Sequence, residues 1–190
     1  MLAQTDLFPA MQMSAVLSGP GNCYRDELCR VWDDDVPMLP VCMCNPSTAD
    51  HERNDPTLLT LIHFAKLWGY GGLLVVNVFS FRSPSPAVML AAADPVGPDN
   101  ARHVAKALIY ARDEGNRCML AAWGNHGASL NRHLWVCNLA EYYGVDLVCL
   151  GTTDAGHPKH PLARGKQFIP RDTWATTWRS AGKGEDQGRG

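Results

Sequence analysis

Amide and imidazole side chains recur in this sequence where apolar segments give way to loops. Asn45 directly follows one apolar segment, Asn77 lies near the end of another, and His157 and His160 follow a third. Amides both donate and accept hydrogen bonds, and imidazoles exchange protons near neutral pH. Side chains of these types can bind the edge of a flat heterocycle and stabilise charge that develops on it.

Four apolar segments predict short parallel strands covered on both faces, because they do not alternate with polar residues. They are Met38–Cys44, Leu73–Phe79, Arg117–Ala122 and Asp146–Leu150. Helical patterns alternate with them at Pro56–Trp68, Ser85–Ala93, Asp99–Glu114 and Gly127–Tyr143. This alternation predicts a three-layer α/β/α sandwich with a short, mainly parallel four-stranded sheet. Ligands of such folds bind outside the carboxyl ends of the strands, where the amides and imidazoles would converge.

Length and composition fit one domain. The chain has 190 residues, of which 46% are hydrophobic, and its formal net charge is −2. We expect one α/β domain over residues 21–175, between flexible segments at 1–20 and 176–190. No apolar run approaches the roughly 18–20 residues that span a bilayer, and no export signal is recognisable, so we expect a cytoplasmic protein. The odd number of cysteines, seven, fits free thiols in a reducing compartment.

Basic side chains gather toward the carboxyl end of the chain. Residues 151–190 carry seven basic and four acidic side chains, and residues 157–171 carry no acidic one. A local basic patch can bind phosphates even where the whole chain is slightly acidic. We therefore expect DNA or a nucleotide as the partner, with no membrane and no obligate protein partner.

Cofactor and metal motifs give little signal. No Gly-x-Gly-x-x-Gly or Gly-x-x-x-x-Gly-Lys element occurs, so neither a dinucleotide nor a P-loop site is predicted, and we expect no cofactor. A metal-dependent hydrolase is an alternative, with His157, His160 and either Asp50 or Asp154 as ligands. The acidic run 33–35 is interpreted as a solvated turn rather than a metal site.

Several short strings carry a family resemblance. They are Asn45-Pro-Ser-Thr-Ala-Asp50, Asp55-Pro-Thr57, Trp68-Gly-Tyr-Gly-Gly72, Val76-Asn77 and Ala122-Trp-Gly124. Together they resemble a bacterial and phage family, the domain-of-unknown-function family numbered 1643. The resemblance covers about residues 20–172, and it implies no particular activity.

Four elements in order also resemble a second group of proteins. Cys44-Asn45-Pro46-Ser47, Val75–Arg82, Ala121-Ala122-Trp123-Gly124 and His157–Leu162 occur in this order along the chain. They are similar to the water-activating loop, base-reading strand, Leu-Leu-Trp-Gly strand end and His-Pro-Ser-Pro-Leu loop of the uracil-DNA glycosylase superfamily. The last element has one insertion. The Gly-Gln-Asp-Pro-Tyr loop of the true uracil enzymes is absent, which leaves the base undefined.

The second resemblance implies cleavage of an N-glycosidic bond of a base in DNA or in a nucleotide. Such cleavage needs a positioned water and hydrogen-bond donors for the charge on the departing base. The catalytic residues are predicted to be Asn45, His157 and Asp50. Base binding is predicted for Asn77, Ser47, Phe79 and Phe81, and DNA contact for Lys159, His160, Leu162, Arg164 and Lys166.

Structural roles compete with several of these predictions. Asp50 could cap a local turn, Asn45 could build one, and Phe79 and Phe81 could pack in the core. The second functional hypothesis is a non-catalytic module that binds a base or nucleotide in the same pocket, because no carboxylate directly precedes Pro46.

A geometric condition applies to both base-binding hypotheses. Asn45, Asn77 and His157 must line one pocket if they are to contact the same ring, and side chains that point into separate regions would contradict both hypotheses.

Overall fold

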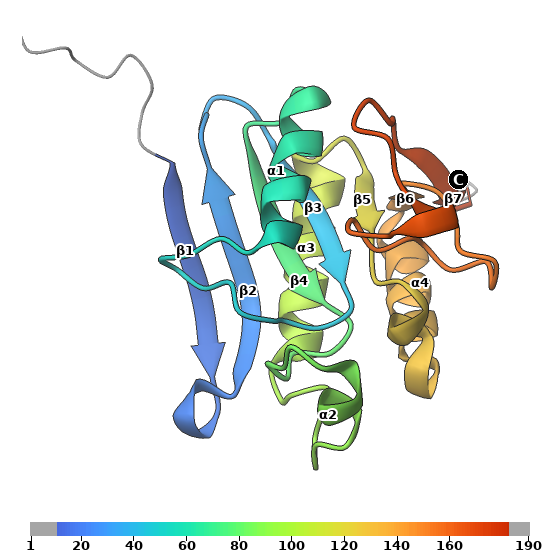
Figure 1. Ribbon diagram of the computed structural model, residues 1–190. Coiled ribbons are helices and arrows are strands. Elements are labelled where there is room, and N and C mark those ends of the chain that lie inside the picture. The colour runs from blue at the N-terminus through green and yellow to red at the C-terminus, as the bar shows by residue number, and fades with distance from the viewer. Residues whose placement is uncertain (1–10, 183–190) are drawn as a thin grey trace, which may run out of the picture.

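The predicted apolar segments form the centre of a larger β-sheet. In a computed structural model that describes residues 11–182, seven strands form one sheet with helices on both faces (Figure 1). The strands are β1 (Gln12–Ser18), β2 (Tyr24–Val31), β3 (Met38–Met43), β4 (Gly72–Asn77), β5 (Cys118–Ala121), β6 (Asp146–Cys149) and β7 (Thr176–Arg179). The α-helices are α1 (Pro56–Leu67), α2 (Pro86–Leu90), α3 (Asn100–Asp113) and α4 (Arg132–Tyr143). Three short 3-10 helices cover Pro20–Asn22, Asn125–Asn131 and Gly165–Gln167.

The sheet is mixed, with a parallel centre and antiparallel edges. Its strand order is β1-β2-β4-β3-β5-β6-β7. The pairs β4–β3, β3–β5 and β5–β6 are parallel, whereas β1–β2, β2–β4 and β6–β7 are antiparallel. The prediction of an α/β domain is confirmed, but the sheet has seven strands rather than four.

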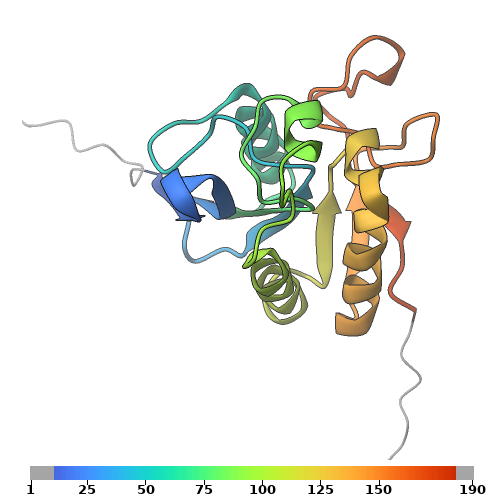
Figure 2. The same ribbon diagram turned by 90° about the horizontal axis from the view of Figure 1, so that it is seen from below.

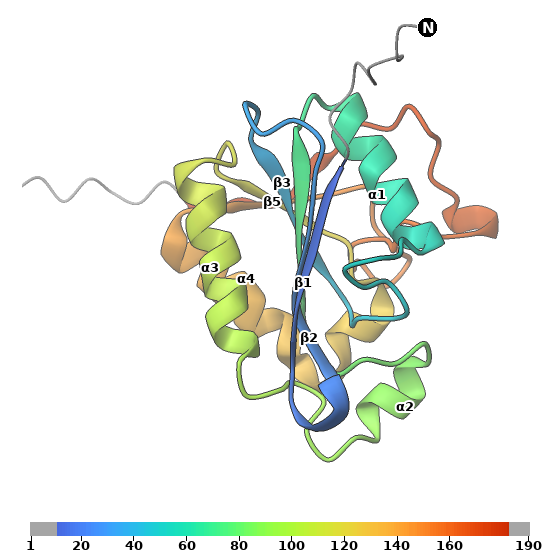
Figure 3. The same ribbon diagram turned by 90° about the vertical axis from the view of Figure 1, so that its left-hand side faces the viewer.

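Helices cover the two faces of the sheet unequally. Helix α1 packs on one face, and α3 and α4 pack on the other, as Figure 3 shows with the sheet seen nearly edge-on. Helix α1 begins where the sequence predicts, because the carboxylate of Asp55 accepts a hydrogen bond from Leu58 N at 2.8 Å and Pro56 occupies the first turn. Helix α4 begins later than predicted, at Arg132, because Leu130 and Asn131 adopt left-handed backbone conformations.

Three strands were missed because their sequences do not read as apolar runs. β1 alternates exposed and half-buried residues, as an edge strand does, and β7 is largely exposed. β2 is buried but carries Arg25, Asp26, Glu27 and Arg30. β1 and β7 lie outside residues 21–175, the range expected for the domain. The rest of the expected flexible ends, residues 1–10 and 183–190, lies outside the described residues.

The four parallel strands end at the same edge of the sheet. Figure 2 views the molecule from this end and shows the loops after β3, β4, β5 and β6 gathered there. The fold therefore brings together segments that are far apart in the sequence. Among the described residues, the longest helices are too short or too polar to cross a bilayer.

Candidate functional site

A cleft of about 520 Å³ lies at the carboxyl ends of β3 and β5, between the loops that follow them and the loop after β6. Its apolar floor includes Met43 and Trp123, and Trp123 is 1% exposed. Its polar lining comprises Asn45, Ser47, Thr57, Ser83, Asn125, His126, Thr153, His160, Arg164 and Gln167. Ligand sites commonly combine such an apolar floor with a few convergent polar groups.

A smaller cavity of about 60 Å³ adjoins the cleft on the α1 side of the sheet. The cavity and the cleft share Met43, Asn45, Ser47, Thr57 and His160 in their walls. The remaining lining of the cavity is Arg25, Ala49, Asp55, Leu58, Leu61, Val75 and Asn77. This volume holds a few water molecules or the edge of a small ring.

Asn77, the last residue of β4, lines this cavity and has an unpaired side-chain amide. It is 0% exposed, and neither its Oδ1 nor its Nδ2 has a hydrogen-bond partner among the described residues. Its backbone carbonyl accepts a bond from the Asn100 side chain at 2.8 Å, so only the Asn77 side chain is unsatisfied. Leaving a buried polar group unpaired costs about 1–3 kcal/mol. The cavity therefore offers a ligand one donor and one acceptor on a single residue.

Asn45 is held in place by the loops around it. Its Nδ2 donates to the carbonyl oxygens of Pro46 at 3.0 Å and Ser83 at 2.8 Å. Ser83 N in turn donates to the Pro46 carbonyl at 2.9 Å. With both amide protons engaged, the Oδ1 of Asn45 is free to accept a hydrogen bond.

His160 is fixed in one neutral tautomer. Its Nδ1 accepts a hydrogen bond from the backbone N–H of Leu162 at 3.1 Å, so the ring proton lies on Nε2. Burial lowers the pKa of His160 below its ordinary value, and the nearby Asp55 opposes this only in part. His160 therefore lines both the cavity and the cleft as a neutral hydrogen-bond donor.

Arg25 reaches the cavity because of a bulge in β2. The pairing of β1 and β2 skips Asp26, so Arg25 turns away from the face on which Glu27 meets α3. Its Nη1 donates to the Ala49 carbonyl at 2.5 Å, whereas its buried Nε has no partner among the described residues. Burial lowers the pKa of Arg25 to about 10. Neither apolar periodicity nor motif spacing identified this residue.

Asp55 and Thr57 also line the cavity, at the amino terminus of α1. In the sequence, Asp55 belongs to the string Asp55-Pro-Thr57 of the family resemblance, and no site role is predicted for it. One of its carboxylate oxygens caps the helix, as described above, and the other faces no partner in the described part of the chain. Asp55 is thus the carboxylate of the cavity.

His157 lies outside the cavity and the cleft. Its ring packs edge-on against His133 of α4, with ring centroids 5.2 Å apart. The turn before it closes through Thr153 N, which donates to the His157 carbonyl at 2.8 Å, and this fixes the backbone. The condition that Asn45, Asn77 and His157 line one pocket is met by the two amides and not by His157. His160, three residues later, occupies the pocket instead.

The other predicted catalytic residue, Asp50, faces its own turn. Its Oδ1 accepts bonds from Glu52 N and Arg53 N, both at 2.9 Å, and these bonds lower its pKa. The predicted stacking residues also lie elsewhere: Phe79 is buried in the core on the α3 side, and Phe81 packs edge-on against Tyr24. The structure thus places all three in the structural roles that compete with function.

The residues predicted for DNA contact divide into three groups. His160 and Arg164 line the cleft, and Arg164 is exposed. Leu162 lines a separate groove of about 380 Å³ between α1 and the loop 161–171. Lys159 lies near Gly151, and Lys166 is exposed in the 3-10 helix of this loop.

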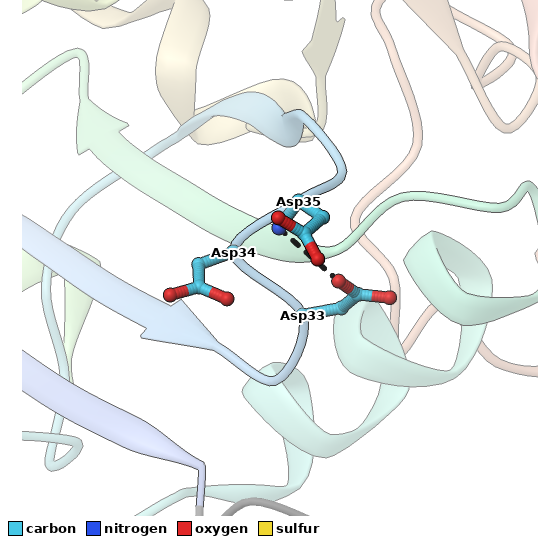
Figure 4. Close-up of side chains that lie close together, drawn as sticks. All are labelled: Asp33, Asp34 and Asp35. Carbon is cyan, nitrogen blue, oxygen red and sulfur yellow. Dashed lines mark hydrogen bonds between the residues drawn. The ribbon is translucent and has the colours of Figure 1, made fainter.

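The proposed metal ligands His157, His160, Asp50 and Asp154 do not form a cluster. Within residues 11–182, one group of three potential ligands is close enough to share an ion, namely Asp33, Asp34 and Asp35. Figure 4 shows these exposed side chains in the turn between β2 and β3, where Asp33 accepts a bond from Asp35 N at 3.2 Å. This turn precedes β3, whereas the cleft lies beyond its end. The acidic run is therefore a solvated turn, as interpreted from the sequence.

The fold and the cleft define an α/β protein with a polar-lined cleft at the carboxyl edge of its parallel strands. The chain matches the family model described as "Protein of unknown function (DUF1643)" over residues 25–162, and it belongs to this family. No curated protein and no solved structure matches the chain significantly.

Proposed function

We propose that the protein is a nucleobase-processing enzyme that hydrolyses the N-glycosidic bond of a base in DNA or in a nucleotide. The observation that carries this proposal is the buried amide of Asn77, which offers an unpaired donor and acceptor at the floor of a polar cavity. An amide in this state is suited to the Watson–Crick edge of an unstacked base. The adjoining cleft has room for the sugar and its phosphates.

The residues of the cavity can be assigned to the steps of this hydrolysis. The bond from the anomeric carbon to the base breaks, and its electron pair moves into the ring. The Nε2–H of His160 donates to the oxygen on which this charge develops. The Oδ1 of Asn45 orients a water that adds to the anomeric carbon, and the carboxylate of Asp55 accepts its proton. In this proposal His160 replaces His157, and Asp55 replaces Asp50.

We also propose that the fold is related to the uracil-DNA glycosylase superfamily. Support comes from the four elements of the resemblance, since each contributes to or borders the same edge of the parallel strands. They are the loop at Asn45, the strand ending at Asn77, the turn at Trp123 and the loop at His160. The antiparallel strands at both edges of the sheet are additions to the four-stranded core on which this resemblance rests.

A non-catalytic module that binds a base or nucleotide is the second candidate. It is favoured by the position of Asp50, whose carboxylate is engaged in its own turn rather than in the cavity. In that case Asn77 and His160 bind a ring without cleaving its bond. The same residues then matter for affinity, and no base is released.

The experiment that separates the candidates measures base release. The protein is incubated with oligonucleotides that carry uracil, hypoxanthine or modified pyrimidines, and alkali-labile sites are scored. The enzyme proposal predicts release from at least one of them, with a loss of about 100- to 1,000-fold in His160→Ala, because a donor to developing charge is removed. His157→Ala is the matched control and keeps its activity. Binding without release from any substrate supports the module.

A further inference from the structure

Arg25 is a buried cation that no carboxylate contacts directly, although the charges of Asp55, which lines the same cavity, and of Asp50 favour its ionised form. It is 5% exposed, and no carboxylate lies within 4.0 Å of its guanidinium in the part of the chain that the structure describes. Its pKa, although lowered by burial to about 10, still keeps it charged at neutral pH. Buried charges are costly unless they are paired. The Nε–H of Arg25 still lacks an acceptor, which a ligand in the cavity can supply.

Other donors face the same cavity. The Nδ2 of Asn77 has no acceptor among the described residues, and the ring proton of His160 lies on Nε2. Together with the Nε of Arg25, these groups form a set of donors from three separate segments of the chain. A ligand that satisfies them presents acceptor oxygens to the interior of the protein.

Shape and charge limit the kind of anion. The guanidinium is planar, and its donors match the two acceptors of a flat group. Asp55 lines the same cavity, so a second negative charge on the ligand would be repelled.

We propose that the small cavity beside the cleft, which Arg25, Asn77 and His160 line, binds a planar, singly charged anionic group, with Arg25 as its charged partner. Two sources share this chemistry, namely a carboxylate and the ionised edge of a pyrimidine-type ring. This inference deepens the proposed function, and it rests on that function only in taking the ligand to be base-like. If the ring is the source, Arg25 favours the ionised base, which is the form in which a base leaves the sugar.

The test is a calorimetric titration of the full chain at neutral pH with four probes. Barbiturate is a pyrimidine ring that is ionised at this pH, uracil is a neutral ring of similar size, and acetate and inorganic phosphate test the carboxylate and the tetrahedral anion. We expect barbiturate or acetate to bind, and barbiturate to bind at least about tenfold more tightly than uracil if the ring is the source. Arg25→Gln should remove this preference and weaken anion binding about 10- to 100-fold.

A matched control separates the effect of direct contact between Arg25 and the anion from the effect of positive charge nearby. Arg82 is a cation whose charge acts on Arg25 but which does not line the cavity, so Arg82→Gln should preserve the preference. If Arg25→Gln does not fold, the wild-type protein still reports through the Nε–H resonance of Arg25, assigned with Arg25→Lys, which should shift on addition of the bound anion.

The outcomes are decisive in both directions. Binding of acetate assigns the subsite to a carboxylate, and binding of barbiturate alone assigns it to a ring. The proposal is overturned if neither binds, if uracil binds as tightly as barbiturate without acetate binding, if phosphate binds most tightly, or if the preference survives in Arg25→Gln. Because these titrations require no base release, the anion subsite can stand where the enzyme proposal fails, and the reverse also holds.

Discussion

Arg25 and Glu27 lie two residues apart on β2, and their buried charged groups differ in how completely the fold supplies hydrogen-bond partners. On the α3 side, the Glu27 carboxylate accepts bonds from Lys106 Nζ at 2.9 and 3.0 Å and contacts His103 Nδ1 at 3.1 Å. On the α1 side, Arg25 has one carbonyl partner for Nη1, and its Nε is unpaired among the described residues. The charged group of Glu27 is fully bonded within the fold, as is that of Arg30 on the α1 side, whereas the guanidinium of Arg25 is bonded only in part.

The same contrast applies to the buried amides at this edge of the sheet. Asn100 donates to the Asn77 carbonyl and to Ser80 Oγ, and its Oδ1 accepts from Arg132 at 3.0 Å. The Asn77 side chain has no such partner. Folded proteins pair nearly all buried polar groups, so two unsatisfied side chains that line one cavity support the proposed ligand site.

The largest effect is expected from removing the unpaired amide. Asn77→Leu keeps the number and branching of the side-chain heavy atoms and deletes two unsatisfied polar atoms. We expect the free energy of unfolding to rise by about 1 kcal/mol, while affinity for the free base falls about 10- to 100-fold. Urea unfolding and calorimetry measure the two quantities on the same protein. A loss of both stability and affinity would instead assign Asn77 a structural role.

Glu27→Gln is the complementary change on the α3 face. It removes charge-assisted bonds to Lys106 and His103, so we expect the free energy of unfolding to fall by about 2 kcal/mol. Ligand affinity should change less than about twofold, because Glu27 does not line the cavity. Urea unfolding and base binding test this, and an altered affinity at unchanged stability would remove the contrast between the two faces.

The stability of the folded protein should respond to acid through His160, which lines the cavity. Burial lowers the pKa of His160 below its ordinary value of about 6.5. The folded protein therefore prefers the neutral ring. Its stabilising contribution is complete above the unfolded pKa and is lost as the pH falls toward the folded pKa.

Base affinity should follow the folded pKa of His160 itself. We expect it to fall by up to about tenfold per pH unit below that pKa, because a proton on Nδ1 would oppose the Leu162 N–H. His160→Gln keeps a donor in place of Nε2–H and does not titrate, so its affinity should lack this acid limb. An acid limb that persists in the variant would assign the titration to another group.

The smallest effect concerns the basic loop. Arg164 lines the cleft and Lys166 does not, although both are exposed. If DNA occupies the cleft, Arg164→Ala should weaken binding a few-fold and reduce the slope of log affinity against log salt by about 0.9. Lys166→Ala should change the slope less. Equal slopes for the two variants would place the phosphates outside the cleft.

The centre of the fold could be predicted because its residues carry a simple signal. The strands around Val41 and Val76 are apolar throughout, and Asp55-Pro56 marks the start of α1. The edge strands could not be predicted in this way. β2 buries charged residues such as Glu27, which bond to side chains on α3, and no local sequence pattern indicates such long-range pairing.

The site could be predicted by element but not residue by residue. Asn45 and Asn77 were found because each stands where an apolar strand ends. The choice between His157 and His160 depends on a tight turn in the loop after β6, which turns one ring toward α4 and the other toward the cavity. Arg25 reaches the cavity only because β2 has a bulge at Asp26, and the residues of β2 give no signal that predicts this bulge.

The claim that the unpaired groups of Asn77 and Arg25 bind a ring is tested most directly by crystal structures. Crystals of the protein would be soaked with free uracil, hypoxanthine, barbiturate or a modified pyrimidine. We expect at least one compound to place the edge of its planar ring in the small cavity, within about 3.2 Å of both Oδ1 and Nδ2 of Asn77. Ordered waters that satisfy Asn77 and Arg25 in every soak, with no ring in the cavity, would contradict it.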